Sequence, residues 1–370
     1  MDRNPSMRIG FDAKRAYYNS SGLGNYSRSI LTALISYYPR NQYFLFVPTV
    51  SHRLYAPAGV TEVSAGYAPL GGLWRYLHMG KVAEKLQLDV FHGLSNELPK
   101  DICRCRAKKI VTIHDAIFMR YPQWYKWHDR LIYEHKTAWA CKVADVVVAA
   151  SEQTKSDLVQ YFRVPEEKIT VVYQPCNSLF SRQPAAEEQN FVKEKYHLPG
   201  QYLLMVGNIE PRKNILSVIQ AKEKNHISIP LVIVGKETAY AQTLKAYAAE
   251  KKLSDIYFYH HVDNQELSSF YAMALMLIYV SWFEGFGIPI IEAMHSGTPV
   301  ITGNHSCFQE TAGKAALYAD VENIDDIAEK ISRLANDASL QKTLVAAGCE
   351  QVKKYDAETI VRQIVRLYEE

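Results

Sequence analysis

Apolar runs and amphipathic stretches alternate along this chain of 370 residues. Runs such as Leu275–Val280 are almost wholly apolar, and many are followed by glycine, proline or asparagine. An uninterrupted apolar run of this length is typical of a parallel strand that is covered on both faces. Strands are therefore expected near residues 8–11, 43–47, 89–93, 109–115, 145–149, 169–173, 202–207, 231–235, 256–259, 275–280 and 300–302.

Helices are expected between many of these strands, because apolar residues recur there at helical spacing. Strands that alternate with helices predict an α/β fold built on parallel sheets. Between Gln174 and Pro199 the alternation breaks down and prolines gather, which predicts a domain boundary. The expected domains are two similar α/β halves, residues 1–180 and 190–354. Helices are predicted at about 26–38, 124–143, 324–336, 339–353 and 357–369.

Composition excludes several classes of protein. A hydrophobic content of 48% and a charged content of 22% are ordinary for a globular protein. The net charge of +3 is too small to predict nucleic-acid binding. No apolar run reaches the length of a membrane span, and Met1–Ser6 lacks the apolar core of a signal peptide, so we expect a cytoplasmic protein. The six cysteines have no zinc-finger spacing and read as reduced thiols.

The stretch from Ser281 to Met294 carries the densest candidate chemistry. Gly285 and Gly287 lie between an expected strand and a helix that is expected to begin near Pro289. Glycines in such a turn let the backbone approach a ligand closely, and a helix N-terminus favours a bound anion. The sequence therefore predicts a site for a negatively charged group in this turn.

Two carboxylates flank the turn. Glu284 is expected on the loop and Glu292 in the first helical turn, so both should face the carboxyl edge of the sheet, where open α/β folds bind ligands. Taken singly, Glu284 reads as a solvated loop carboxylate and Glu292 as compensation for the helix dipole. Their spacing around Gly-Phe-Gly and a proline favours a shared binding role instead.

The segment SWFEGFGIPIIEAMHSGTPVI, residues 281–301, resembles the signature of the retaining glycosyltransferase family 4. Members of that family have the GT-B fold, in which two Rossmann-like domains face a deep cleft, and they transfer a sugar from a nucleotide-sugar donor. The resemblance implies that the first domain serves the acceptor and the second the donor. It also implies that residues 355–370 cross back to the first domain.

The resemblance assigns roles to the residues of this signature. Glu284 would accept hydrogen bonds from hydroxyl groups of the transferred sugar, and Glu292 from the ribose hydroxyls of the donor. Carboxylate oxygens suit both roles because they are hydrogen-bond acceptors. The donor site would also be lined by Gly285, Phe286, Gly287 and Ile288.

The segment VGNIEPRKN places two cations after an expected strand. Gly207 ends the strand, and Arg212 and Lys213 lie at the entry to the next helix. A guanidinium group can bind two phosphate oxygens at once, while an ammonium group supplies a compact charge. Because the segment also resembles that of the family, we interpret these three residues as a diphosphate site.

His114 is the candidate from the first half of the chain. VTIHDAIF resembles a family segment whose histidine reaches the transferred sugar and the donor phosphate. His92 near the end of another expected strand is a second candidate, although a histidine at a strand end is more often structural. Asp115 either orients His114 or contacts the acceptor, and the sequence leaves both roles open.

Three further positions enter through the resemblance. Gly22 and Gly24 follow the first strand, in a turn that lies near the donor phosphates and the acceptor in the family. Val262 follows a later strand, in a turn that lies beside the nucleobase in the family.

The expected helix at residues 124–143 combines aromatic with basic residues. Its aromatic side chains either pack against the sheet, which is the more common arrangement, or contact a membrane surface. The second interpretation would suit a lipid-linked acceptor at the inner membrane face.

Together these features predict a retaining transferase that moves a hexose, with mannose as the best choice, from GDP-mannose or another nucleoside-diphosphate sugar to a glycan or lipid-linked saccharide. VTIHDAIFMRYP and VGNIEPRKN are similar to segments of members that use GDP-mannose in surface polysaccharide assembly. No Asp-x-Asp pair stands at a suitable strand end, so neither a metal nor a cofactor is expected. The alternatives are a non-catalytic nucleotide-sugar-binding protein and a sugar-nucleotide epimerase of the same fold.

Overall fold

The computed structural model describes residues 6–65 and 71–370, so the expectation for Met1–Pro5 lies outside the described residues. The chain forms two compact units. The first, called the N-terminal unit, comprises Met1–Pro175 together with Asp356–Glu370. The second, called the C-terminal unit, comprises Cys176–Tyr355.

The N-terminal unit is built on a parallel sheet of seven strands in the order β3-β2-β1-β4-β5-β6-β7. Because successive strands are added on one side of β1 and then on the other, the direction of winding reverses between β1 and β4. The strands are β1 (Arg8–Asp12), β2 (Gln42–Val47), β3 (Val60–Ser64), β4 (Val90–Gly93), β5 (Lys108–Ile113), β6 (Val146–Ala149) and β7 (Ile169–Val171).

Two apolar cores cover the two faces of this sheet. One is formed with α2 and α16, and the other with α4, α6 and α7. The helices of the unit are α1 (Lys14–Tyr18), α2 (Gly22–Tyr37), α3 (Gly71–Leu77), α4 (Met79–Lys85), α5 (Ile117–Arg120), α6 (Trp127–Val143), α7 (Glu152–Phe162) and α16 (Ala357–Glu369).

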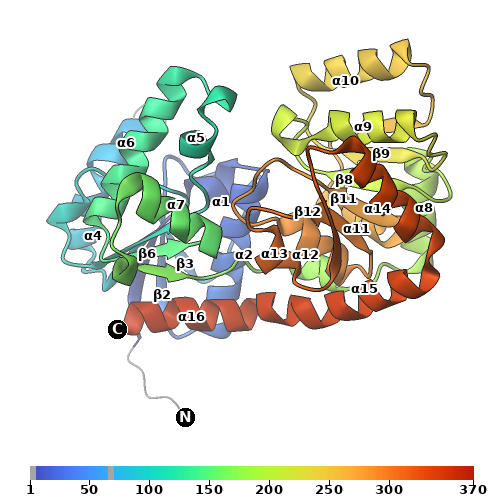
Figure 1. Cartoon of the computed structure of the whole chain (residues 1–370). Helices are drawn as coiled ribbons and strands as arrows, with labels where there is room; N and C mark the ends of the chain where they lie inside the picture. Colours follow the sequence, from blue (N-terminus) through green and yellow to red (C-terminus); the bar gives the residue numbers. More distant parts are fainter. Residues whose placement is uncertain (1–5, 66–70) are drawn as a thin grey trace. The chain divides into compact units, whose positions relative to one another are not determined.

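The last helix of the chain, α16, belongs to the N-terminal unit and packs against α2 (Figure 1). Ile360, Ile364 and Tyr368 lie on its buried face and join the core of the first strands. The Tyr368 hydroxyl also lies 2.8 Å from Nδ1 of His92 in the sheet. A helix distant in sequence therefore completes this core.

The C-terminal unit is built on a parallel sheet of six strands in the order β10-β9-β8-β11-β12-β13, and its winding reverses between β8 and β11. The strands are β8 (Leu203–Val206), β9 (Leu231–Val234), β10 (Ile256–Tyr259), β11 (Met276–Tyr279), β12 (Val300–Gly303) and β13 (Ala316–Ala319). The helices are α8 (Ala186–Tyr196), α9 (Ile215–Lys224), α10 (Ala239–Glu250), α11 (Asn264–Met273), α12 (Ile288–His295), α13 (Phe308–Ala312), α14 (Ile324–Asn336) and α15 (Ala338–Gln351).

The structure contains the expected strands and adds β3 and β13, which the sequence did not predict. Two predicted helix starts are wrong. Helix α2 begins at Gly22 rather than near Tyr26, and α6 begins at Trp127 because a 3-10 turn, Pro122–Trp124, precedes it. The proline-rich region after Gln174 contains α8 as well as irregular chain.

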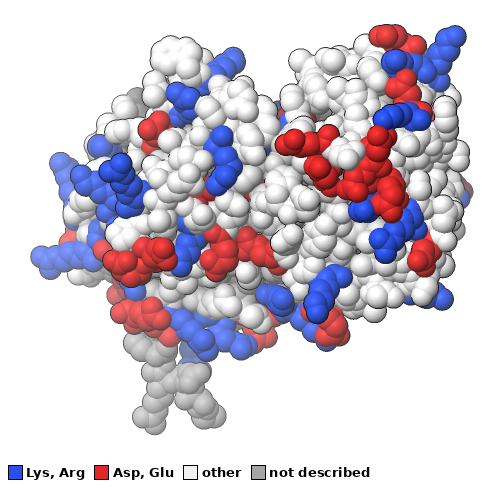
Figure 2. Space-filling model, in the orientation of Figure 1, with Lys and Arg blue, Asp and Glu red and all other residues white. Residues whose placement is uncertain are grey.

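Helix hydropathy and surface charge are two further properties of the described part of the chain. Within residues 6–65 and 71–370, no helix combines the length and the apolar character that crossing a membrane requires. On the drawn face of each unit, basic and acidic residues are both exposed, and they gather in small groups of like charge (Figure 2).

Candidate active site

The candidate site of the C-terminal unit lies where the winding of its sheet reverses. Strands β8 and β11 are neighbours, yet the chain continues from them to opposite sides of the sheet. The loops that follow two such strands diverge and leave a crevice at their carboxyl ends. Arg212 and Lys213 follow β8, and Glu284 follows β11, so the sheet brings these three residues together.

Glu284 binds both cations at once. Its Oε2 lies 2.7 Å from Nη1 of Arg212, and its Oε1 accepts a hydrogen bond of 2.7 Å from Nζ of Lys213. Arg212 also donates to the backbone carbonyl of Phe283 at 2.9 Å. All three charged side chains are largely buried, with exposed side-chain fractions of 17%, 11% and 11% for Arg212, Lys213 and Glu284.

Local backbone geometry explains why the two cations can reach Glu284. Pro211–Lys213 form a 3-10 turn, and Asn214 takes a left-handed conformation with φ of 57° before α9 begins. Gly207 has φ of +136°, and a Cβ atom there would lie only 3.0 Å from Cε of Lys213. Glycine at position 207 therefore provides both the turn and the space that the lysine side chain occupies.

The electrostatics of the cluster follow from burial and pairing. Burial alone would raise the pKa of Glu284, but the charges of Arg212 and Lys213 outweigh it and hold that pKa at about 2. Burial lowers the pKa of the Lys213 ammonium group, and Glu284 only partly opposes this. Since one carboxylate serves two buried cations, the buried cluster carries an excess positive charge; Glu210, 3.6 Å from Arg212, is more exposed.

The backbone around Glu284 is held in place by the segment that follows β12 and by the loop that carries Arg212. The hydroxyl of Ser306 donates to the carbonyl of Glu284 at 3.0 Å. The Cys307 thiol donates to the same carbonyl at 3.3 Å and to that of Phe286 at 2.9 Å. Trp282 donates its backbone N–H to the carbonyl of Arg212 at 2.9 Å, which ties the two loops together.

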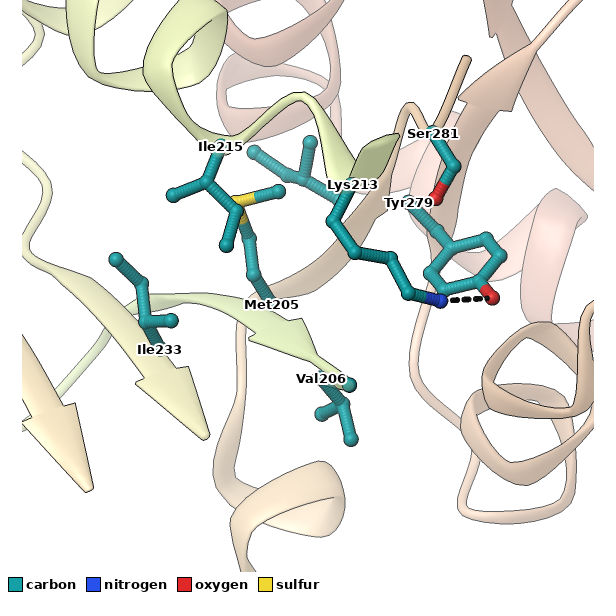
Figure 3. Close-up of a pocket in the computed structure, with 9 residues that line it drawn as sticks. Met205, Val206, Lys213, Ile215, Ile233, Tyr279 and Ser281 are labelled. Atoms are coloured by element: carbon teal, nitrogen blue, oxygen red, sulfur yellow. Dashed lines mark hydrogen bonds between the residues drawn. The ribbon is translucent and has the colours of Figure 1, made fainter. Parts of the chain in front are cut away.

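A small pocket adjoins this cluster, and two of its polar residues were not predicted from the sequence (Figure 3). The Tyr279 hydroxyl accepts a hydrogen bond of 2.9 Å from Nζ of Lys213. The buried Ser281 hydroxyl has no hydrogen-bond partner among the described residues. The only sequence signal for both was their place at the end of a strand before the glycine turn. The pocket is lined by Met205, Val206, Gly207, Lys213, Ile215, Ile233, Ile278, Tyr279 and Ser281.

Glu292 lies deeper in α12 than the sequence predicted. It is the fifth residue of that helix rather than part of the first turn, so the dipole of the first turn is not what it compensates. Its Oε2 accepts a hydrogen bond of 2.8 Å from the hydroxyl of Tyr271 on α11. Burial raises the pKa of Glu292 to about 7, although the hydrogen bond from Tyr271 acts in the opposite direction.

The glycine turn precedes α12 as predicted. Gly287 caps the helix with φ of +106°, and Ile288 is the first helical residue. Gly285 and Phe286 are buried. Val262 is half-buried in the loop between β10 and α11, and the structure does not bring it into the charged cluster.

His114 follows β5 in the N-terminal unit and is buried. Its Nε2–H donates to the carbonyl of Leu94 at 2.8 Å, and its Nδ1 accepts from the side-chain amide of Gln174 at 3.0 Å. Burial lowers its pKa to about 4. Both ring nitrogens are therefore occupied within this unit, and a ligand would have to replace one of these bonds.

His92 and the first glycine pair have different surroundings. His92 is a core residue whose Nε2 lies 2.8 Å from the Thr112 hydroxyl. Gly22 and Gly24 lie in the first turn of α2 rather than in a loop. A Cβ at Gly24 would lie 1.8 Å from the carbonyl oxygen of Asn19, so this glycine permits close packing, whereas Gly22 borders open space.

Comparison with known proteins identifies the chain. A family model described as "Glycosyl transferases group 1" matches residues 187–351, and one described as "Glycosyltransferase Family 4" matches residues 21–178. The chain belongs to glycosyltransferase family 4. One model matches most of the N-terminal unit and the other most of the C-terminal unit, so both units resemble glycosyltransferase domains.

Two bacterial relatives of this glycosyltransferase carry informative names. The chain is 29% identical over 288 residues to O-antigen chain mannosyltransferase B of Escherichia coli, which covers 75% of this chain and 74% of that protein. It is 32% identical over 237 residues to O-antigen chain mannosyltransferase RfbU of Salmonella typhimurium, which covers 61% of this chain and 63% of that protein. The second match thus spans less than two thirds of that relative.

Solved structures confirm the GT-B fold. A glycosyltransferase from Rickettsia africae matches with a TM-score of 0.78 and 17% identity, covering 99% of this chain and 98% of that one. HepE from Anabaena, whose crystal structure was solved in complex with UDP and glucose, matches with a TM-score of 0.76 and 16% identity over 98% of this chain and 99% of that one.

The raised pKa of Glu292 predicts how stability depends on pH. A carboxyl group with a folded pKa of about 7 binds more protons in the folded than in the unfolded state, so stability is lost as pH rises from about 4.5 to about 7. We expect the wild type to lose roughly 3 kcal/mol of unfolding free energy across this range relative to Glu292→Gln, which cannot ionise. Urea denaturation at a series of pH values measures the difference.

Glu194→Gln, which removes an exposed carboxylate of the same unit, is the control. The difference in unfolding free energy between Glu194→Gln and the wild type should stay constant across the same pH range. A flat difference for Glu292→Gln as well would show that folding does not raise the pKa of Glu292.

Proposed function

We propose that this glycosyltransferase moves mannose from GDP-mannose to a glycan or a lipid-linked saccharide, with retention of the anomeric configuration and without a metal ion. The names of two relatives, both O-antigen chain mannosyltransferases, support the sugar and the class of acceptor. The choice of guanine rests on the sequence likeness to members that use GDP-mannose.

The observation that carries the proposal is the pair of buried cations on Glu284. Arg212 and Lys213 share one buried carboxylate at the carboxyl ends of β8 and β11. A departing nucleoside diphosphate is an anion, and fixed positive charge in a poorly solvated site stabilises it strongly. The cluster therefore suits the leaving group of a nucleotide-sugar donor.

The transfer breaks the bond between the anomeric carbon of the donor sugar and the β-phosphate oxygen. An acceptor hydroxyl oxygen forms the new bond on the same face, and the departing phosphate takes its proton. Arg212 and Lys213 would hold the phosphate oxygens throughout. Glu284 retains lone pairs beyond those used by the two cations, and these would accept hydrogen bonds from sugar hydroxyls.

Glu292 and His114 have the remaining proposed roles. Only Oε2 of Glu292 is bonded among the described residues, to Tyr271, which leaves Oε1 for a ribose hydroxyl. His114 would contact the sugar by exchanging its bond to Gln174 for a bond to the ligand. The proposed lining residues of the donor site are Gly22, Gly24, Gly207, Gly285, Phe286, Gly287, Ile288 and Val262.

Nucleotide binding tests the donor. In a thermal-shift panel of GDP, UDP, ADP and GDP-mannose, we expect GDP and GDP-mannose to stabilise the wild type, by roughly 2.7 kcal/mol at about a hundred times the dissociation constant. Arg212→Ala and Glu292→Ala should lose the shift. Arg182→Ala, which removes an exposed arginine of the same unit, should keep it.

If only UDP or ADP raised the melting temperature, the donor would carry a different base from the one proposed. If no nucleotide raised it, the proposal would be overturned. Binding without sugar transfer or donor hydrolysis would favour the non-catalytic alternative. An interconverted sugar would favour the epimerase.

Product analysis tests stereochemistry and metal dependence together. With GDP-mannose and a mannose-containing acceptor, the one-bond coupling between the anomeric carbon and its proton in the NMR spectrum should show that the product has the anomeric configuration of the donor. An excess of EDTA should leave the rate unchanged, because Arg212 and Lys213 supply the positive charge. An inverted product, or loss of activity that Mg²⁺ restores, would contradict this part of the proposal.

We also propose a peripheral membrane contact through α6. The structure divides its aromatic residues: Trp139 is half-buried beneath Lys100, whereas Trp127 and Tyr133 are 71% and 43% exposed. Leu131 and Ile132 beside them are 49% and 50% exposed. Exposed aromatic and aliphatic side chains of this kind suit the interface of a lipid bilayer.

Vesicle binding tests this contact. The double variant Trp127→Ser, Ile132→Ser should co-sediment less than the wild type with vesicles that contain phosphatidylglycerol. Phe191→Ser, which removes a 62% exposed aromatic residue of the C-terminal unit, is the matched control. Equal co-sedimentation of all three proteins would show that α6 does not contact the membrane. Concentration-dependent dimerisation that requires α6 would show that its exposed apolar residues bind a second copy of the chain and not a lipid bilayer.

A further inference from the structure

The sheet of the N-terminal unit has its own point of reversal, between β1 and β4, and a second group of charged residues lies there. Asp12 is the last residue of β1, and Lys14 and Arg15 begin α1 directly after it. Glu97 follows β4. In open α/β sheets the crevice at such a point is where ligands bind.

Two carboxylates of this group are already neutralised. Arg75 on α3 donates from Nε to Oδ1 of Asp12 at 2.9 Å and from Nη2 to Oδ2 at 2.5 Å. The same Nη2 also bonds to Glu97. Lys136 on α6 donates to the other oxygen of Glu97 at 2.8 Å. Arg75, Asp12 and Glu97 are all buried, so this is a closed ion network within the unit.

Lys14 and Arg15 lie outside this network. Within residues 6–65 and 71–370, neither side chain has a hydrogen bond or an ion pair, and Nε of Arg15 is buried without a partner. Burial lowers the pKa of Lys14, and the neighbouring charge of Arg75 adds to this effect. Two cations thus lie in a partly desolvated place without a carboxylate of their own.

The balance of charge in the group is positive. Its four cations, Lys14, Arg15, Arg75 and Lys136, face the two carboxylates of Asp12 and Glu97. Helix α2, whose start packs against Arg15, has no acidic residue in its first turn. Partly buried cations without counter-charge are unfavourable unless another anion neutralises them.

We propose that Lys14 and Arg15 bind a phosphate group of a substrate, with the Arg75 network holding the backbone around them. Guanidinium and ammonium groups together recognise phosphate oxygens well. The phosphate belongs either to the nucleotide donor or to a phosphorylated acceptor. The site rests on residues of the N-terminal unit alone, so it does not depend on the chemistry proposed for Glu284.

Calorimetric titration with inorganic pyrophosphate tests the site. The double variant Lys14→Gln, Arg15→Gln should bind pyrophosphate roughly tenfold or more weakly than the wild type. The matched control is Lys81→Gln, Lys85→Gln, which removes the same charge from exposed positions on α4 and should bind within about twofold of the wild type. Arg15→Lys keeps the charge but loses the paired donors of the guanidinium group, so its affinity for pyrophosphate should lie between those of the wild type and the double variant.

A second titration with GDP distinguishes the sources of the phosphate. If it belongs to the donor, the Lys14→Gln, Arg15→Gln variant should weaken GDP binding by a factor similar to that for pyrophosphate. If it belongs to the acceptor, GDP affinity should be unchanged, and GDP-saturated protein should still bind pyrophosphate.

Affinities for pyrophosphate and GDP that are both unaffected by Lys14→Gln, Arg15→Gln would overturn the proposal, as would a wild type that binds neither ligand. Equal weakening by the Lys81→Gln, Lys85→Gln control would also overturn it, because only the overall charge would then matter. If Arg212→Ala left nucleotide binding intact, the donor site proposed at Glu284 would be contradicted, but the pyrophosphate result for Lys14 and Arg15 would still stand.

Discussion

Much of the C-terminal unit is arranged around one carboxylate that two cations share. Glu284 can hold Arg212 and Lys213 only because β8 and β11 are neighbours and their loops meet at the end of the sheet. Removing the carboxylate would leave two buried charges of the same sign together, which is strongly unfavourable. The pairing also leaves an excess of positive charge in the cluster, which is why we propose that it binds an anion.

Both units bury charged side chains at the point where the winding of their sheet reverses. Each sheet reverses its winding once, and a buried group of charged side chains lies at each of those two points. Parallel strands all end at one edge, where the backbone leaves the regular ladder and side chains of opposite charge can be buried together. The architecture therefore decides where charge can be concentrated, and the local sequence decides its sign.

How much the sequence could predict depended on whether a feature is local. Apolar runs are local, so the strands and the helices 324–336 and 357–369 could be placed within a residue or two. The pairing of Arg212 with Glu284 joins residues 72 positions apart, and the sequence did not predict it. The likeness to a family placed both residues in the donor site without pairing them. Glu292 was expected in the first turn of its helix, but α12 begins at Ile288, one residue before the expected Pro289, so Glu292 is the fifth helical residue.

Partners that lie far away in the sequence were the least predictable. Nothing around His114 indicates that Gln174 binds its ring, or that Arg75 would connect Asp12 with Glu97. Such contacts become visible only when the fold brings distant segments together.

The return of α16 to the N-terminal unit has a consequence for synthesis. Residues of α16 such as Ile360, Ile364 and Tyr368 complete a core whose remaining members come from the first half of the chain, but the ribosome makes α16 after the whole of Cys176–Tyr355. The C-terminal unit is continuous and can fold as soon as it has emerged. The unit that is begun first is therefore the last to be completed, and until then the apolar face of α2 that α16 covers stays open to chaperones.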